Sequence, residues 1–422
     1  MNIQILEINK FAMKTIDKDQ TVTLALLQAA LWHNSEVLLD ADWDIVEGLA
    51  QDQGVLWLAY LGAKYFKQTN CSMIAIPTEN MKQWRGVFCN VAFYNDQINI
   101  VQTRLVQWLA ENKIRAAILK GTSCSRYYPF PEARPLGDID VLVDRKNLDA
   151  VGIYLKNEGF IRRECHHGFH AEYCNENVTV EVHFAGTEVP NSKGGEAVAE
   201  AMKHFLDNAQ TVMLGKMEFP VLSDAHQALM LLLHMERHML DTGITLRQLC
   251  DWTVFVNGIE KTHWESEALE LLRRCGMLVY AKVLTKACVN YLGLNAEKVQ
   301  WCMDIDDELA RAMLDEVFRG GNLGTSNIEN MGSLFTDRTN LGNCGQNKLT
   351  GLLSSLTRLA NQHFPFTQRH KMLVPVFWVF IPLRYLVRSI FGLRPKRKLL
   401  AVYRTADQRQ KLYNALHLYE VK

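Results

Sequence analysis

The sequence predicts an α+β protein in which a small mixed β-sheet core is flanked by helical N- and C-terminal regions. Short apolar runs of strand length cluster between residues 113 and 222, and the stretches on both sides carry apolar residues at helical spacing. With 422 residues, 48% of them hydrophobic, the chain is too long for one small core and indicates two or three domains.

Changes in composition along the chain mark the predicted boundaries. Glycine and asparagine are concentrated between residues 320 and 351, and an apolar, basic stretch follows. We therefore predict five parts: an N-terminal helical region (1–112), a sheet core (113–222), a helical domain (223–319), a Gly/Asn-rich loop (320–351) and a C-terminal helical segment (352–422).

The N-terminal region is expected to be helical from about residue 21. Leu24, Leu27 and Leu31 belong to one apolar stripe, and Gly54 interrupts the pattern further on. A long helix should end near Leu109 and deliver the chain into the first strand. This region shows no catalytic grouping, so we expect its helices to pack on the sheet.

Small polar residues directly follow the first predicted strand, Ile114–Leu119. Gly121, Thr122 and Ser123 open a helix there, so backbone N–H groups and the helix N-terminus can form a cradle for phosphate. Lys120 adds a positive charge to this loop.

The centre of the sheet core is Arg134–Val143, in which one residue separates Asp138 from Asp140. Side chains alternate along a strand, so both carboxylates should point the same way. Two such anions repel each other unless a cation lies between them, and hard oxygen ligands favour magnesium. Arg134 either reaches a phosphate oxygen or ends the preceding loop as a surface arginine.

A third acid lies on the predicted strand Val178–Phe184. Alternation places its valines on one face and Glu181 and His183 on the other. If this strand pairs beside the Asp-x-Asp strand, Glu181 joins Asp138 and Asp140.

Turn residues mark the connections between these strands. Asp144 is expected to cap a helix that ends at a C-cap glycine, Gly159. Gly194 and Gly195 indicate a loop, and Gly215 indicates a hairpin.

The order of strand, glycine-hydroxyl loop, helix, Asp-x-Asp strand, helix and acid-bearing strand resembles the polymerase-beta-type nucleotidyltransferase superfamily. The details are most similar to an uncharacterised bacterial family of nucleotidyltransferases. Its Leu-Lys-Gly and Arg-Pro-x-Gly-Asp-Ile-Asp-Leu-Leu-Val elements match Leu119–Gly121 and Arg134–Val143. Its histidine before a Val-Glu-x-His strand matches His170 before Val180–His183. The resemblance covers roughly residues 25 to 258.

This resemblance implies an enzyme that binds an NTP, as ATP-binding relatives do, and transfers a nucleoside monophosphate to an unknown hydroxyl acceptor. Asp138, Asp140 and Glu181 would be catalytic and would hold two Mg²⁺ ions, one on the triphosphate and one orienting the acceptor. The implied nucleotide-binding residues are Lys120, Gly121, Thr122, Ser123, Arg134 and Gly137. The superfamily's usual Gly-Ser pair is Gly-Thr here with a serine next, which leaves open which hydroxyl touches phosphate.

Further residues are implied to line a pocket: His170, His183, His234, His238, Arg247 and Asp251. For His234 and His238 the alternative is burial on an apolar helix with ordinary hydrogen bonds, and their spacing does not fit the zinc-protease pattern. Arg247 and Asp251 stand four residues apart, so they form either a pair on the helix surface or part of the pocket.

Two other interpretations stay open. One is a catalytically inactive scaffold that binds a nucleotide or a partner, and the other is a membrane-associated factor. Met372–Leu383 is the most apolar run, and prolines, Arg384 and Arg388 interrupt it before the basic Arg394–Lys398. It falls short of a spanning helix and is typical of an interfacial anchor, or of a core helix with a solvated basic end.

Bulk properties narrow the partners and the location. Lys plus Arg equals Asp plus Glu at 46 each, so nothing in the global charge favours nucleic acid. Ten cysteines are scattered without zinc-site spacing, which is typical of reduced thiols. Met1–Lys10 contains an acid and no apolar run, so we expect no signal peptide. A cytoplasmic location follows, peripheral to the inner face of the membrane if the C-terminal segment is an anchor.

Overall fold

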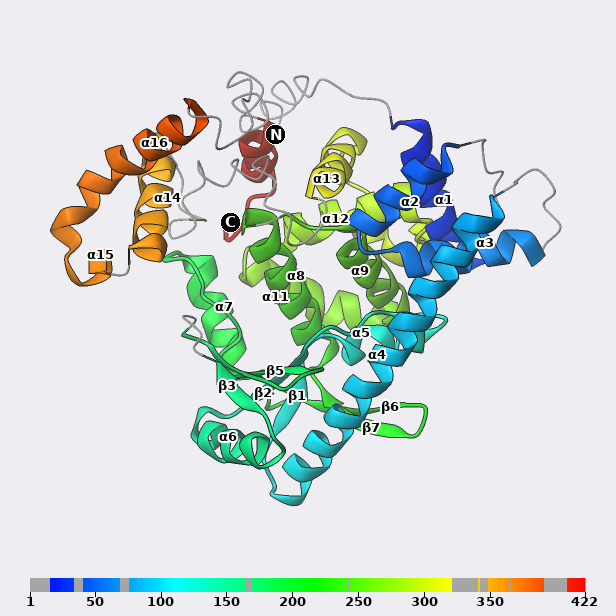
Figure 1. Ribbon diagram of the computed structural model, residues 1–422, viewed down its shortest axis with the longest axis horizontal. Helices are drawn as coiled ribbons and strands as arrows, with labels where there is room; N and C mark the ends of the chain where they lie inside the picture. Colours follow the sequence, from blue (N-terminus) through cyan, green and yellow to red (C-terminus); the bar gives the residue numbers. More distant parts are fainter. Residues whose placement is uncertain are drawn as a thin grey trace.

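The computed structural model describes residues 16–33, 41–68, 76–163, 168–241, 243–320, 341, 348–364, 366–390 and 408–421. A helical layer lies on one side of a single β-sheet (Figure 1). The α+β class with a mixed sheet and flanking helices is thereby confirmed. Most of the expected Gly/Asn-rich loop, the N-terminal ten residues and the basic stretch Arg394–Lys398 lie outside the described residues.

The sheet has seven strands in the order β3-β4-β5-β2-β1-β7-β6. Their bounds are β1 Ala116–Ile118, β2 Ile139–Val143, β3 Ile161–Arg163, β4 His170–Cys174, β5 Thr179–His183, β6 Gln210–Leu214 and β7 Met217–Val221. Strands β2 and β5, and β1 and β7, pair in parallel, and the other neighbours are antiparallel. The central strands β1, β2 and β5 carry the residues of the candidate site.

Four helices precede the sheet, as the apolar stripes predict: α1 Lys18–Trp32, α2 Trp43–Asp52, α3 Leu56–Gln68 and α4 Thr78–Glu111. The break at Gly54 is confirmed, since this residue takes a φ of 67° between α2 and α3. Helix α4 runs obliquely from α3 to the lower end of the molecule in Figure 1. Its C-terminal half packs against the strands through Ile98, Leu105 and Leu109, which brings the chain to β1.

The remaining helices surround the sheet or form the helical layer. They are α5 Thr122–Ser125, α6 Leu148–Asn157, α7 Lys193–Lys203, α8 Asp224–Asp241, α9 Leu246–Gly258, α10 Lys261–His263, α11 Leu269–Arg274, α12 Leu278–Leu292, α13 Asp307–Gly320, α14 Lys348–His363, α15 Phe366–Arg369 and α16 Val374–Ile390. Helices α1 to α3 share one hydrophobic core with α8, α9, α12 and α13. Buried Gln53 joins these two groups, because its amide accepts from Leu246 N at 2.9 Å and donates to Val317 O at 3.2 Å.

The structure confirms two of the predicted connections between strands and contradicts two others. Gly159 has a φ of 86° after α6 and Gly215 has a φ of 59° between β6 and β7, so the C-cap and the hairpin are confirmed. Asp144 is not a side-chain cap; its carboxylate pairs with Arg115 at 2.9 Å. Gly194 and Gly195 lie inside α7, where a Cβ on Gly195 would stand 1.9 Å from a backbone oxygen. Close packing, not a loop, requires glycine there.

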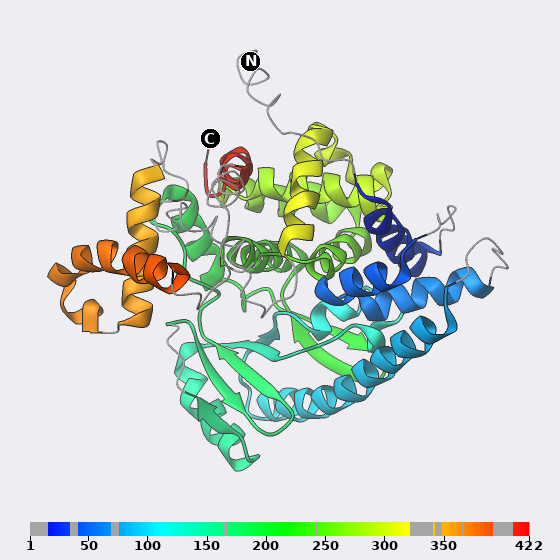
Figure 2. The ribbon, with the colours of Figure 1, turned by 45° about the horizontal axis from the view of Figure 1, so that its top comes forward.

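The C-terminal helices α14, α15 and α16 project from one side of the molecule (Figures 1 and 2). Residues 408–421 return to the helical layer, where buried Arg409 pairs with buried Glu316 at 2.9 Å. Among the helices in the described ranges, none combines the length and hydropathy needed to cross a membrane.

The packing of α1 on α3 makes a testable prediction at Gly62. A Cβ at this buried position would lie 2.0 Å from the Leu26 carbonyl oxygen. We expect Gly62→Ala to destabilise the protein by about 1–3 kcal/mol, measured by urea unfolding, because the helices must separate. Gly48→Ala is the matched control: a Cβ there meets nothing within 4 Å, and we expect a gain of about 0.5–1 kcal/mol. Equal effects of the two substitutions would contradict the close contact.

Candidate active site

Three carboxylates converge at the centre of the sheet. Asp138 directly precedes β2, Asp140 lies within it, and Glu181 lies on β5, where parallel pairing sets it opposite Asp140. Donor oxygens of the three side chains all lie within 4.8 Å of one another. Alternation along the two strands therefore produces the cluster that the sequence predicts, with Asp140 buried and the other two half-buried.

Two cations compensate this negative charge. The Lys120 Nζ lies 2.8 Å from Asp140 Oδ1. Burial acts to lower the pKa of Lys120, but Asp140 and Asp138 outweigh burial and raise that pKa. The His183 Nε2 lies 3.0 Å from the same Asp140 oxygen and 3.3 Å from Glu181 Oε2. These hydrogen bonds outweigh burial and raise the pKa of His183, so its protonated form is favoured.

The carboxylates themselves respond in opposite ways. The neighbouring Asp140 charge, together with burial, raises the pKa of Asp138. Burial acts to raise the pKa of Glu181 as well, but the His183 hydrogen bond and the Lys120 charge lower it to about 2. The cations thus stabilise the charged form of Glu181, whereas the raised pKa of Asp138 indicates that this carboxylate is left short of positive charge.

The donor set fits a divalent cation. The second oxygen of Asp140, Oδ2, is buried and has no hydrogen-bond partner among the described residues, and such an atom normally has one. Asp138 and Glu181 supply further hard oxygen ligands of the kind that magnesium prefers. A second group, formed by His170, Glu181 and His183, also brings its donor atoms within 4.8 Å.

The glycine loop after β1 has the expected place but inward-facing hydroxyls. Gly121 takes a φ of 60°, which favours glycine, and precedes the short helix α5. Thr122 Oγ1 donates to Gln102 Oε1 at 3.0 Å, and Ser123 Oγ donates to Leu119 O at 3.1 Å. Both hydroxyls are buried, and the N–H groups of Ser123, Cys124 and Ser125 donate to carbonyl oxygens of the same loop, so none of these groups is free to meet a phosphate. Gly137, also at positive φ, turns the chain into β2.

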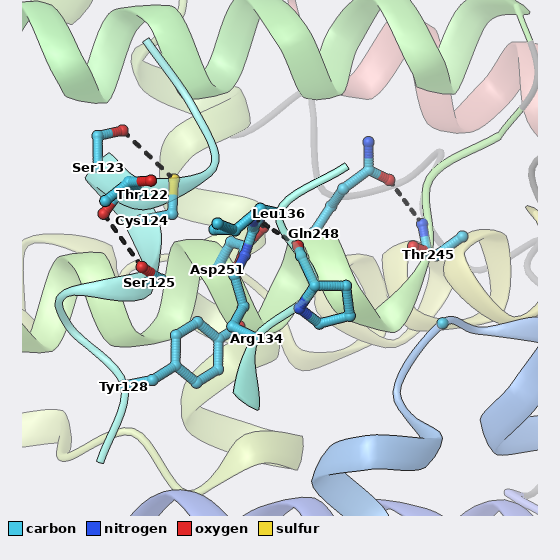
Figure 3. Close-up of polar contacts among 12 residues, drawn as sticks. Thr122, Ser123, Cys124, Ser125, Tyr128, Arg134, Leu136, Thr245, Gln248 and Asp251 are labelled. Carbon is cyan, nitrogen blue, oxygen red and sulfur yellow. Dashed lines mark hydrogen bonds and ion pairs between the residues drawn. The ribbon is translucent and has the colours of Figure 1, made fainter. Parts of the chain in front are cut away.

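Arg134 is neither a surface arginine nor directed at an open site. Its guanidinium makes a buried double contact with Asp251, with Nη2–Oδ2 at 2.6 Å and Nε–Oδ1 at 3.0 Å. Tyr128 also donates to Asp251, at 2.9 Å, and Figure 3 shows these side chains converging. Burial acts to lower the pKa of Arg134, but Asp251 outweighs it and raises that pKa. The surface pair of Arg247 with Asp251 is thus wrong, because Asp251 turns inward to Arg134.

Arg247 is left as a half-buried cation. Within the described residues its guanidinium has no hydrogen-bond partner. Burial and the nearby Arg134 charge lower the pKa of Arg247, while Asp251 and Asp138 act in the opposite direction. A guanidinium kept short of partners beside a carboxylate cluster is suited to bind an anionic ligand.

His234 and His238 lie together on α8 with ring centroids 4.4 Å apart. Both are half-buried, and burial lowers the pKa of each, well below the ordinary value for His234 and to about 4 for His238. The Lys120 charge is the next largest cause for both, which places the pair beside the carboxylate cluster. Arg237, between them in sequence, stacks on Phe169 with 4.9 Å from its guanidinium carbon to the ring centroid.

Sequence reasoning missed three residues that shape the site: Tyr128, Gln102 and Arg237. Tyr128 donates a hydrogen bond to Asp251, and Gln102 accepts one from Thr122. Both residues come from distant segments, and no local sequence pattern distinguishes them. Arg237 had a usable signal, because it stands between two candidate histidines on one helix.

The lowered pKa of His238 makes a testable prediction. Unfolded histidine protonates near its ordinary pKa, whereas folded His238 stays neutral to about 4. Between these values the unfolded state binds more protons, so stability falls as pH falls. We expect His238→Gln to reduce the loss of unfolding free energy between pH 7 and pH 5 by about 1 kcal/mol, measured with urea. The exposed His363→Gln is the control, and an unchanged pH slope in the His238 variant would contradict the assignment.

Comparison with known proteins agrees with this geometry. A search of curated proteins finds no match to the chain. A family model described as "Uncharacterised nucleotidyltransferase" matches residues 40–293, a range that includes the carboxylate cluster, the glycine loop and helices α8 and α9. The chain therefore belongs to this uncharacterised nucleotidyltransferase family.

Proposed function

We propose that the protein transfers a nucleoside monophosphate from an NTP to a hydroxyl acceptor. The observation that carries this proposal is the convergence of Asp138, Asp140 and Glu181 around a buried carboxylate oxygen without a hydrogen-bond partner. Membership of the nucleotidyltransferase family supports an NTP as substrate.

The three carboxylates are proposed to hold Mg²⁺, with two ions as the expected number. When bound, magnesium supplies positive charge to the triphosphate and lowers the pKa of the acceptor hydroxyl. His183 holds Asp140 and Glu181 in fixed orientations through its contacts at 3.0 and 3.3 Å. It thus acts as a positioning residue for both strands.

The triphosphate is proposed to lie along the cationic side of the cluster. Lys120 and Arg247 supply charge there. The same site lies close to His234 and His238, because, besides burial, the charges of Lys120 and Arg237 lower the pKa of both histidines. Arg134 takes a supporting role instead, since Asp251 occupies its guanidinium.

The inactive scaffold is the second candidate, and the complete set of three acids weighs against it. A scaffold that only binds nucleotide has no need of a buried carboxylate oxygen without a partner, because such an oxygen costs about 1–3 kcal/mol. A cytoplasmic location, where NTP and Mg²⁺ are available, belongs to the proposal.

The metal assignment predicts the behaviour of Asp138→Asn. We expect calorimetric titration with each of the four NTPs to lose its Mg²⁺ dependence, and turnover to fall about a hundredfold or more, since charge stabilisation at the reacting centre is lost. Asp144→Asn, at the far end of the same strand, is the matched control and should bind as wild type. Near-normal turnover in the Asp138 variant would contradict the metal assignment. Binding of NTP by the wild-type protein without any turnover would favour the inactive scaffold.

The two arginines predict opposite phenotypes. Arg247→Ala should weaken NTP binding about tenfold or more while leaving the unfolding transition nearly unchanged, because it removes a charge-assisted contact with ligand only. Arg134→Ala should cost about 3–5 kcal/mol of stability, because Asp251 is left buried without its paired cation and keeps, among the described residues, only its hydrogen bond from Tyr128. Arg104→Ala, exposed on α4, is the control for both measurements. Unweakened binding in the Arg247 variant would remove this residue from the site.

A further inference from the structure

Helix α16 has two apolar faces, and only one of them is packed. Val374 is buried, and Trp378 donates from Nε1 to Thr357 Oγ1 on α14 at 2.9 Å. Phe377 lies on the same side, with its ring centroid 4.7 Å from that of Phe364. This face holds α16 against α14.

The opposite face of α16 is apolar and exposed. We call it the exposed apolar face, and it consists of Val376, Val379, Phe380, Leu383 and Val387, extended by Met372 just before the helix. Phe380 stands at its edge, because its ring centroid also lies 5.9 Å from that of Phe364. The five helical positions recur at helical spacing on one side of the axis. Their exposed fractions run from 43% at Val387 to 70% at Val379, and Met372 reaches 94%. Among the described side chains of α16, no charged residue stands at these positions.

In the stretch of sequence that contains α16, all charged side chains are positive. Between Arg338 and Ala406 the sequence holds 12 Lys and Arg residues and no Asp or Glu. Because the whole chain is formally neutral, the remainder carries the matching excess of acids. In the described part of this stretch, Arg369, Lys371 and Arg384 are exposed around α16. An apolar helix face whose neighbouring described charges in this stretch are cations is the pattern of an interfacial helix on an anionic membrane.

We propose that α16 docks the protein on the surface of a membrane that contains anionic lipid. The exposed apolar face enters the boundary between headgroups and acyl chains, and the surrounding arginines and lysines meet lipid phosphates. The helices α14 to α16 project from the body in both ribbon views, so the candidate active site stays on a separate part of the molecule (Figures 1 and 2). The proposal does not depend on nucleotide chemistry.

Two other occupants fit the face less well. Nucleic acid would use the cations and could stack on Phe380, but it gains nothing from the valine, leucine and methionine side chains that make up most of the face. A second copy of the chain would bring the same positive stretch against itself, and like charges repel.

Vesicle flotation of the full-length protein tests the proposal. The probes are vesicles of phosphatidylcholine alone and vesicles of phosphatidylcholine mixed with phosphatidylglycerol. We expect binding to the mixed vesicles, and a loss of about tenfold or more in Val379→Asp/Leu383→Asp, since two side chains lose their apolar burial. The matched control is Ile153→Asp/Met213→Asp, at 61% and 59% exposure on the sheet side of the molecule. All four positions are exposed, so unfolding curves should stay unchanged.

The remaining measurements distinguish lipid, nucleic acid and a second copy of the chain as the partner of this face. Lys371→Gln/Arg384→Gln should weaken binding to the mixed vesicles only, in support of the lipid phosphates as partners. Failure to float with either vesicle, or equal binding by the Val379/Leu383 variant, overturns the proposal. Binding of a single-stranded RNA in place of vesicles assigns the segment to nucleic acid. If the wild-type protein binds no vesicles and is a dimer in analytical ultracentrifugation, and the Val379/Leu383 variant is a monomer, the face is assigned to a second copy of the chain.

Discussion

Three carboxylates within 4.8 Å of one another cannot share a site in the sheet unless positive charge is supplied, and the surrounding structure is arranged around this requirement. Lys120, from the loop after β1, and His183, from β5, contact the same oxygen of Asp140, and the second oxygen of that carboxylate has no hydrogen-bond partner among the described residues. Protein cations thus neutralise the cluster incompletely. The shortfall is what makes the site suited to a metal ion, and through it to a triphosphate.

The rigidity of the site comes from contacts between segments that are distant in sequence. The buried pair of Arg134 and Asp251 ties the loop before β2 to helix α9. Thr122 is held by Gln102 on α4, and Leu119 O accepts from Gln227 on α8 at 2.8 Å. Contacts from both the sheet and the helical layer therefore hold the residues of the cluster in place.

Local pattern was enough to predict the elements that carry the acids. Strict alternation in Val178–Phe184 fixed the face of Glu181, and the spacing of Asp138 and Asp140 fixed theirs, so the cluster could be foreseen once the strands were assumed to pair. The partners of Arg134, Thr122 and Asp251 could not, because hydrogen-bond partners from other segments leave no periodic signal. The assignment of glycine pairs to loops failed at α7 for a related reason: close approach of another backbone also requires glycine. The predicted domain boundaries stay predictions.

The parallel register of β2 and β5 has a consequence for how the chain folds. Helix α6 and strands β3 and β4 lie between these two strands in the sequence, so the pairing of β2 with β5 is a non-local contact, of the kind that slows folding. Glu181 therefore joins Asp138 and Asp140 only when β2 and β5 have paired. A divalent cation held by all three carboxylates would favour the folded state, because the unfolded chain does not assemble these ligands.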